Sequence, residues 1–175
     1  GLEAYTAELD AKLDALEELL RGYNDGRHKT LFHMAAYLLP PEDLNAALAE
    51  RAGVDLYLEP LNVTTDHPGN FLRDTRTAAE LVRLVGSPRL RVLYDIYHMQ
   101  LSEGDLCGAI RRFAGAFGHV HAADTPGRHE PGTGEIAFPR VLRALERSGY
   151  TGYVSFELFP ARSTAEAVRA IRALW

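Results

Sequence analysis

Four short apolar segments of this sequence each end in a side chain that can bind a metal ion. The four side chains are those of Glu59 in YLEP, Asp95 in LYDIYH, His121 in HVHAAD and Glu157 in SFELFP. They follow one another at intervals of 36, 26 and 36 residues, each close to the length of one strand, one helix and the return to the next strand. This spacing predicts one such side chain per strand at the same level of one face, where parallel α/β folds place their active sites.

The three carboxylates of this set would repel one another at close range unless a cation neutralised them. Ligation by several oxygens and one nitrogen suits Mg²⁺, Mn²⁺ or Co²⁺ better than a metal that prefers thiolates. The sequence therefore predicts a divalent metal ion as cofactor. The alternative is that each side chain is an independent helix cap or a buried hydrogen-bonding group. Asp95 could cap the helix that follows it, and His98 could be a satisfied core histidine.

Strands that alternate with helices must position these side chains. Short apolar runs and amphipathic segments, separated by Gly and Pro signals, predict one helix followed by five strand–helix pairs. The expected strands are 30–36, 55–60, 91–96, 118–122 and 152–157. The expected helices are 2–23, 42–52, 75–85, one from Ser102 or Asp105 to Phe117, and 139–147. A last helix is opened by a capping box of Ser163 and Glu166. This alternation predicts a parallel sheet with right-handed crossovers in one α/β domain over residues 1–175.

Composition limits the class of protein and its partners. The 175 residues are 46% hydrophobic and 25% charged, as in an ordinary globular domain. The net charge is −5 and the Lys and Arg residues are scattered, so a nucleic-acid partner is not expected. Cys107 is the only cysteine, and the first twenty residues form an acidic helical pattern that is neither a signal peptide nor a membrane span. We therefore expect a cytoplasmic protein with no membrane partner.

Several longer motifs resemble a known family. They are EPLN at 59–62, DHPG at 66–69, YDIYHMQ at 94–100, HVHAAD at 119–124, PGRHEPGTGEI at 126–136 and the late strand that ends in Glu157. Together they resemble the hydroxypyruvate isomerase family, within the larger xylose isomerase-like TIM-barrel group. The match is dense from Leu56 to Pro160, and PGRHEPGTGE is its most specific element.

The resemblance implies a (β/α)₈ TIM-barrel fold in which the fifth to eighth strands supply the metal ligands. It implies a metal-dependent isomerase that interconverts hydroxypyruvate and tartronate semialdehyde through an enediolate. In that family the two glutamates, here Glu59 and Glu157, also serve as the acid/base pair. In related ketose epimerases the histidine three residues after the aspartate and an arginine in the loop after the third ligand hold the substrate, which implies these roles for His98 and Arg128.

Further polar residues lie in loops on the presumed active face. His67 and His129 are candidates for contact with a small hydroxy-carbonyl acid or sugar substrate, or else plain surface residues. Glu135 is a candidate for orienting a neighbour of the substrate, or else a residue that only precedes a helix. His33, in the first predicted strand, either reaches the pocket or belongs to the core.

Two features depart from the pattern of the family. Hydroxypyruvate isomerases commonly have Gln as the third ligand, whereas His121 is the choice of the ketose epimerases, so a ketose 3-epimerase is an alternative function. A complete barrel needs about 250 residues, and the sequence has 175. We therefore expect the first three βα units to be absent, and the strand at 30–36 to be the fourth of the barrel.

The shortened barrel would leave two open sheet edges, which favour association. Either the chain is a fragment, or a partner such as a second copy in a homo-oligomer closes the barrel. A non-catalytic metal-binding or carbohydrate-binding remnant is therefore a third hypothesis. An endonuclease of the same barrel group that repairs abasic DNA is disfavoured, because its richer histidine cluster and basic groove are not visible in the sequence.

Overall fold

The computed structural model describes residue 46 and residues 49–175, in two compact units. The described part of the smaller unit comprises 46, 49–56 and 87–90, where Ser87 Oγ donates a hydrogen bond of 2.5 Å to Glu50 Oε1 and Asp55 forms an ion pair of 2.9 Å with Arg89. The larger unit, residues 57–86 and 91–175, contains all four predicted metal ligands.

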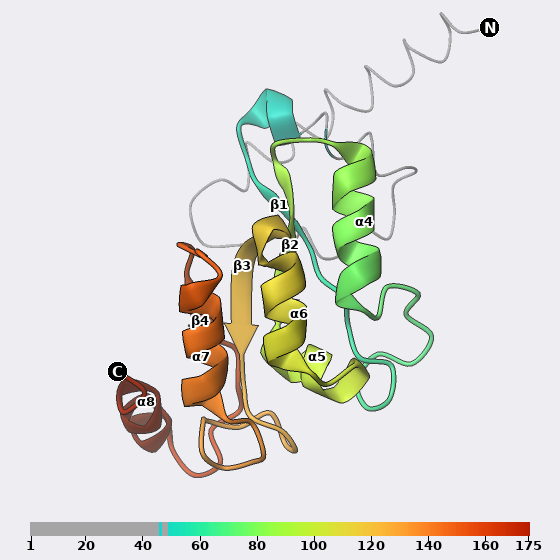
Figure 1. The fold of residues 1–175 in the computed structure, drawn as a ribbon. Helices are drawn as coiled ribbons and strands as arrows, with labels where there is room; N and C mark the ends of the chain where they lie inside the picture. The colour runs from blue at the N-terminus through green and yellow to red at the C-terminus, as the bar shows by residue number, and fades with distance from the viewer. Residues whose placement is uncertain (1–45, 47–48) are drawn as a thin grey trace, which may run out of the picture. The chain divides into compact units, whose positions relative to one another are not determined.

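Four strands form one sheet in the order β1-β2-β3-β4 (Figure 1). They are β1 (Leu56–Leu58), β2 (Leu90–Asp95), β3 (Phe117–Ala122) and β4 (Val154–Phe156). β2 pairs with β3 and β3 pairs with β4, in both cases in parallel. Because neighbours in the sheet are also consecutive in the chain, the strands are arranged as in a stretch of a barrel wall. The predicted α/β fold of TIM-barrel type is confirmed for this part of the chain.

Helices follow the strands close to the predicted positions. They are α4 (Thr75–Val85) after β1, α5 (Ile96–Ser102) and α6 (Leu106–Phe113) after β2, α7 (Phe138–Arg147) after β3 and α8 (Thr164–Arg172) after β4, with a 3₁₀ turn η1 (Ala114–Ala116) before β3. Gly86 ends α4 with φ 68°, a left-handed conformation that glycine adopts without a steric cost. Ser163 opens α8 as predicted, because its hydroxyl accepts a hydrogen bond from the backbone nitrogen of Glu166.

One prediction about the segment after β2 is wrong, and one helix in it was missed. The helix expected to run to Phe117 starts after the N-cap Asp105 but ends at Phe113, and Phe117 is the first residue of β3. The segment Ile96–Ser102 was not predicted to be helical, yet it forms α5. An apolar run of this length fits a strand as well as a buried helix, and periodicity alone does not separate them. His98 therefore lies in the first turn of a helix.

The core of the larger unit lies between the sheet and the helices α4, α6 and α7, which stand side by side over one face of the sheet (Figure 1). Val92, Tyr94 and Val120 point into this core, and the Tyr94 ring stacks on Phe117 with a centroid distance of 4.5 Å. Since side chains alternate along a strand, Asp95 and His121 are directed to the opposite face.

Other predictions lie outside the described residues. These are the helix at 2–23, the strand at 30–36 with His33, and most of the helix at 42–52, of which residues 46 and 49–52 are described and are helical. No helix in the described part of the chain has the length and apolar character needed to cross a membrane.

Candidate metal centre

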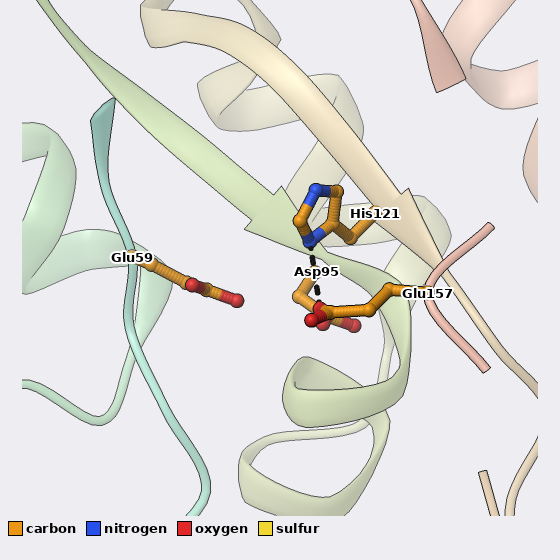
Figure 2. Close-up of side chains that lie close together, drawn as sticks. All are labelled: Glu59, Asp95, His121 and Glu157. Atoms are coloured by element: carbon orange, nitrogen blue, oxygen red, sulfur yellow. Dashed lines mark ion pairs between the residues drawn. The ribbon is translucent and has the colours of Figure 1, made fainter. Parts of the chain in front are cut away.

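The four predicted ligands converge at the carboxyl ends of the strands (Figure 2). Glu59 directly follows β1, Asp95 ends β2, His121 lies in β3 and Glu157 directly follows β4. One ligand atom of each side chain lies within 4.8 Å of those of the other three. Asp95 and His121 are register partners, and Glu157 lies two residues beyond Ser155, the register partner of His121. Parallel pairing therefore sets the common level of the cluster, as the sequence spacing predicts.

Asp95 uses its two carboxylate oxygens differently. Its Oδ1 accepts hydrogen bonds from the backbone nitrogens of Tyr97 at 2.8 Å and His98 at 3.3 Å, and so caps α5. Its Oδ2 accepts a hydrogen bond of 3.1 Å from Nη2 of Arg128. The side chain is only 1% exposed. The helix-cap hypothesis for Asp95 is therefore correct, and it leaves the second oxygen available to the cluster.

The carboxylates of the cluster are crowded and differ in their environment. Burial, reinforced by the negative charges of Asp95 and Glu157, raises the pKa of Glu59 to about 8. Burial also raises the pKa of Asp95, against the opposing charge of Arg128. The contact with His121 lowers the pKa of Glu157 to about 2, with further help from the Arg128 charge. Burial and the neighbouring negative charges therefore outweigh the positive charges of His121 and Arg128 at Glu59.

His121 faces Glu157 without a regular hydrogen bond. Its Nδ1 lies 3.0 Å from Oε2 of Glu157, but the two atoms lack hydrogen-bond geometry, and Nδ1 is buried with no hydrogen-bond partner among the described residues. Burial alone would lower the pKa of His121, but the Glu157 contact and the charges of Glu59 and Asp95 outweigh it and raise the pKa. Buried polar atoms are normally satisfied, so this nitrogen needs a partner.

The donor set fits a divalent metal ion. Three carboxylates and one imidazole nitrogen offer oxygen-rich ligation of the kind that Mg²⁺ and Mn²⁺ accept. A cation bound among them would neutralise the carboxylates and would give Nδ1 of His121 a partner.

Arg128 spans two of the candidate ligands. Its Nη2 donates hydrogen bonds to Oδ2 of Asp95 at 3.1 Å and to Oε2 of Glu157 at 2.8 Å. Its guanidinium also lies over the ring of Tyr97, 4.9 Å from the ring centroid. The backbone of Arg128 has φ 56°, a left-handed conformation that is uncommon for a residue with a side chain. The predicted position of Arg128 at the site agrees with this geometry, and its role toward a substrate remains a prediction.

One buried carboxylate shapes the loop that carries Arg128. Asp124 is 0% exposed and lies two residues beyond the end of β3. Its two oxygens accept hydrogen bonds from four backbone nitrogens, those of Thr125 at 2.9 Å, Gly132 at 2.9 Å, Gly134 at 2.9 Å and Ile136 at 3.0 Å. We call residues 124–136 the Asp124 loop. This carboxylate folds the loop back on itself, so that Arg128 points toward the cluster.

His98 is buried beside the cluster. It is 1% exposed, its Nε2 lies 3.8 Å from Oδ2 of Asp95, and its Nδ1 lies 2.7 Å from Nδ2 of Asn62. Burial, together with the positive charge of Arg128, lowers the pKa of His98 to about 3. His98 is therefore neutral at physiological pH in this environment.

The remaining predicted residues lie at different places. His67 packs edge-on against His98, with the ring centroids 5.3 Å apart, so it borders the site. Glu135 is exposed and accepts a hydrogen bond of 3.3 Å from Gln100, outside the four-residue cluster. His129 holds the backbone oxygen of Phe159 at 2.6 Å through Nδ1, which is a structural contact.

Sequence reasoning missed Asn62, Asp66 and Asp124. Asn62 belongs to the EPLN motif and Asp66 to the DHPG motif, but neither had a predicted role. The signal for Asp124 is an acidic residue at a strand end that precedes a loop with three glycines, which leaves many backbone nitrogens without a secondary-structure partner.

A parallel α/β sheet with a metal-competent side chain at the end of each of four consecutive strands defines a barrel protein with a candidate metal centre. The chain belongs to the xylose isomerase-like TIM barrel family, whose model matches residues 5–174.

Similar proteins are isomerases and epimerases by name. A human protein named putative hydroxypyruvate isomerase is 39% identical over 137 residues, which are 77% of this chain and 50% of the relative. The hydroxypyruvate isomerase of Escherichia coli is 42% identical over 114 residues, 65% of this chain and 44% of the relative. Others are named 2-oxo-tetronate isomerase, from Cupriavidus necator, and 3-dehydro-D-guloside 4-epimerase, from Escherichia coli, each 36% identical.

Among solved structures, a Brucella melitensis protein described as an AP endonuclease of family 2 superposes with a TM-score of 0.70 at 35% identity, over 75% of this chain and 50% of that one. The chain spans about half the length of the curated relatives that it matches.

Proposed function

We propose that the protein is a metal-dependent isomerase that interconverts hydroxypyruvate and tartronate semialdehyde. The observation that carries this proposal is the cluster of Glu59, Asp95, His121 and Glu157, whose ligand atoms lie within 4.8 Å of one another beside Arg128. Relatives named hydroxypyruvate isomerase support the choice of substrate. Mg²⁺ and Mn²⁺ are the proposed ions.

The four ligands would hold the metal ion, which when bound acts as a Lewis acid on the oxygens of the substrate. Glu59 and Glu157 come from the two outer strands of the four, on either side of Asp95 and His121. A substrate above the centre would therefore have one glutamate on each flank. We assign to these two glutamates the transfer of a proton between adjacent carbons, with one carboxylate accepting it and the other donating it.

Two further side chains would hold the substrate. The Arg128 guanidinium can pair with a substrate carboxylate through two parallel hydrogen bonds, because its planar fork matches a carboxylate. His98 would contact a carbonyl or hydroxyl oxygen, since its Nε2 faces the cluster 3.8 Å from Oδ2 of Asp95. His67, next to His98, is a candidate for the same subsite.

Solvent-deuterium incorporation tests this function. Purified protein is incubated with hydroxypyruvate in ²H₂O, with and without Mn²⁺, and the product is followed by proton NMR after removal of the metal. We expect metal-dependent incorporation that Glu157→Gln abolishes. Folded, metal-bound protein that incorporates no deuterium would overturn the proposal and leave a non-catalytic metal-binding protein.

A ketose 3-epimerase is the second candidate. It is favoured by His121, which resembles the third ligand of ketose epimerases, and by a relative named as an epimerase. Turnover of fructose or tagatose in place of hydroxypyruvate would select this function, because a ketose lacks the carboxylate that Arg128 would pair with.

A further inference from the structure

Asn62 is the most buried polar residue of the loop that follows β1, with 0% exposure, and it lies three residues beyond Glu59. Its side-chain oxygen accepts hydrogen bonds from the backbone nitrogens of Thr65 at 3.0 Å and Asp66 at 3.2 Å. Its Nδ2 donates a hydrogen bond of 2.7 Å to Oδ2 of Asp66. If the oxygen and nitrogen of this amide were exchanged, the NH₂ group would face the backbone N–H groups of Thr65 and Asp66, and the oxygen would face the Asp66 carboxylate. These partners therefore fix the orientation of the Asn62 amide.

The orientation of the Asn62 amide determines the tautomer of His98. The same Nδ2 lies 2.7 Å from Nδ1 of His98, and the backbone nitrogen of Asn62 points to that nitrogen as well, at 3.4 Å. Both neighbours of Nδ1 are therefore donors, and Nδ1 must be the unprotonated acceptor. A neutral imidazole carries one hydrogen, so the hydrogen lies on Nε2.

The protonated nitrogen is directed toward the candidate metal centre. Nε2 of His98 lies 3.8 Å from Oδ2 of Asp95, which is too long for a hydrogen bond to that oxygen. Because His98 is anchored through Nδ1 to Asn62 and through its backbone nitrogen to Asp95, the ring presents its N–H at a fixed place beside the cluster.

We propose that Asn62 is a positioning residue that holds His98 as the Nε2–H tautomer, so that His98 offers a hydrogen-bond donor, and not a base, to an oxygen of the substrate. The first part rests on the geometry alone. The second part rests on the proposed isomerase function.

Asp66 extends this arrangement. Its carboxylate accepts a hydrogen bond of 2.7 Å from the Asn62 amide, and it is ionised because this bond and the nearby Tyr97 side chain lower its pKa against the cost of burial. An ionised carboxylate accepts only, so it keeps the Asn62 amide nitrogen as the donor. The hydrogen bonds that join Asp66, Asn62 and His98 therefore have fixed donors and acceptors.

Long-range ¹H–¹⁵N NMR of the histidine ring tests the first part, because a protonated and an unprotonated ring nitrogen have distinct ¹⁵N shifts. The His98 signals are assigned by their loss in His98→Gln, and spectra are recorded without metal and with Mg²⁺. We expect a protonated Nε2 and an unprotonated Nδ1 in the wild-type protein. Wild-type protein with a protonated Nδ1 would overturn the inference, whatever the variants do.

Asn62→Asp is the sharpest variant, because it has nearly the same shape but presents an acceptor to Nδ1. We expect it to invert the tautomer, so that Nδ1 becomes protonated. Asn70→Ala is the matched control, since the Asn70 amide lies in the same loop and donates instead to the backbone oxygen of Leu72 at 2.6 Å. We expect the wild-type tautomer in that control. An unprotonated Nδ1 of His98 in folded Asn62→Asp would contradict the role of Asn62.

The second part is tested by kinetics with hydroxypyruvate. We expect Asn62→Asp to raise KM roughly tenfold to a hundredfold through loss of one hydrogen bond to substrate, with a smaller change in kcat. In a His98→Gln background the same substitution should leave KM unchanged, because Asn62 acts through His98. An equal effect in both backgrounds would overturn the second part. If the wild-type tautomer is as expected but no turnover occurs, the isomerase proposal fails while the assignment of the tautomer stands.

Discussion

Nη2 of Arg128 lies 2.8 Å from Oε2 of Glu157, so the guanidinium occupies a position next to an oxygen that a metal ion would also use. The same nitrogen contacts Asp95 at 3.1 Å. Arg128 therefore supplies positive charge to the carboxylates of the candidate metal centre, and it competes with a divalent cation for them.

Removing this charge should strengthen metal binding. We expect Arg128→Met to lower the Kd for Mn²⁺ about tenfold, because the repulsion of a unit charge a few ångströms away is relieved. The same substitution should strongly reduce hydroxypyruvate turnover. Isothermal titration calorimetry measures the first effect. Arg112→Met is the control, since Arg112 pairs with Asp105 at 3.3 Å and should leave both quantities unchanged. Weaker Mn²⁺ binding by Arg128→Met would contradict the competition.

The raised pKa of Glu59 makes the stability of the metal-free protein depend on pH. Because its pKa is about 8 in the folded protein against an ordinary value of 4.5, the folded state binds the proton more tightly than the unfolded state. The stabilising contribution is complete below about pH 4.5 and is lost as the pH rises through about 8. Glu59→Gln cannot ionise and should escape this loss.

In the presence of a chelator, we therefore expect the Tm of Glu59→Gln to exceed that of the wild type by about 5 °C at pH 8.5, with little difference at pH 5. Thermal unfolding followed by circular dichroism at the two pH values measures this. Glu80→Gln, on the exposed side of α4, should follow the wild type at both. Parallel curves for Glu59→Gln and the wild type would show that Glu59 is not the titrating group.

Asp124 should matter for both folding and binding. In Asp124→Asn, one amide group would replace a carboxylate that accepts four backbone hydrogen bonds, and its NH₂ would face donors. We expect the free energy of unfolding to fall by about 3 kcal/mol, as measured by urea denaturation. Asp74→Asn is a suitable comparison, because Asp74 caps α4 and Asn caps a helix equally well, so its effect should be small. Similar losses in both variants would refute a special role for Asp124.

Gly134 should not tolerate a side chain. A Cβ at this position would lie 2.7 Å from Oδ1 of Asp124 and would also meet the backbone oxygen of Thr125. We expect Gly134→Ala to cost about 2 kcal/mol, since neither neighbour can move without breaking the bonds of the loop. Gly115→Ala, in η1, has nothing within 4 Å of the added carbon and should be nearly neutral. Equal stability of the two variants would show that the Asp124 loop is more adaptable than its hydrogen bonds indicate.

The strand order and the convergence of the four ligands could be predicted from the sequence because they depend on spacing. Once consecutive strands pair in parallel, side chains at their carboxyl ends must meet, and Glu59, Asp95, His121 and Glu157 do so. Helix ends marked by single residues, such as Gly86 and Ser163, were predictable for the same reason, since their effect is local.

The supporting contacts could not be predicted, because they join residues by tertiary geometry. Asn62 and His98 are 36 residues apart, and nothing in the spacing indicates that the amide of one meets Nδ1 of the other. The helix α5 was missed because a short buried apolar run looks like the end of a strand, whereas the hydrogen bonds from Tyr97 and His98 to Asp95 mark the start of a helix. Glu135 accepts a hydrogen bond from Gln100, and its predicted role in orienting a neighbour of the substrate stays a prediction.

The Asp124 loop encodes its own shape. The carboxylate of its first residue, Asp124, accepts hydrogen bonds from backbone nitrogens of the turns that follow. The backbone nitrogen of Asp124 also donates to the carbonyl oxygen of His129 at 2.8 Å, and the backbone nitrogen of Glu135 donates to the carbonyl oxygen of Thr125 at 2.9 Å. Its contacts with the rest of the chain include bonds to Phe159 and Ala161, in the segment after β4. These thirteen residues therefore form a unit that can be grafted into another protein. Grafted between the corresponding strand and helix of another barrel, together with the segment after the next strand, they should carry an arginine to the new centre in its original pose.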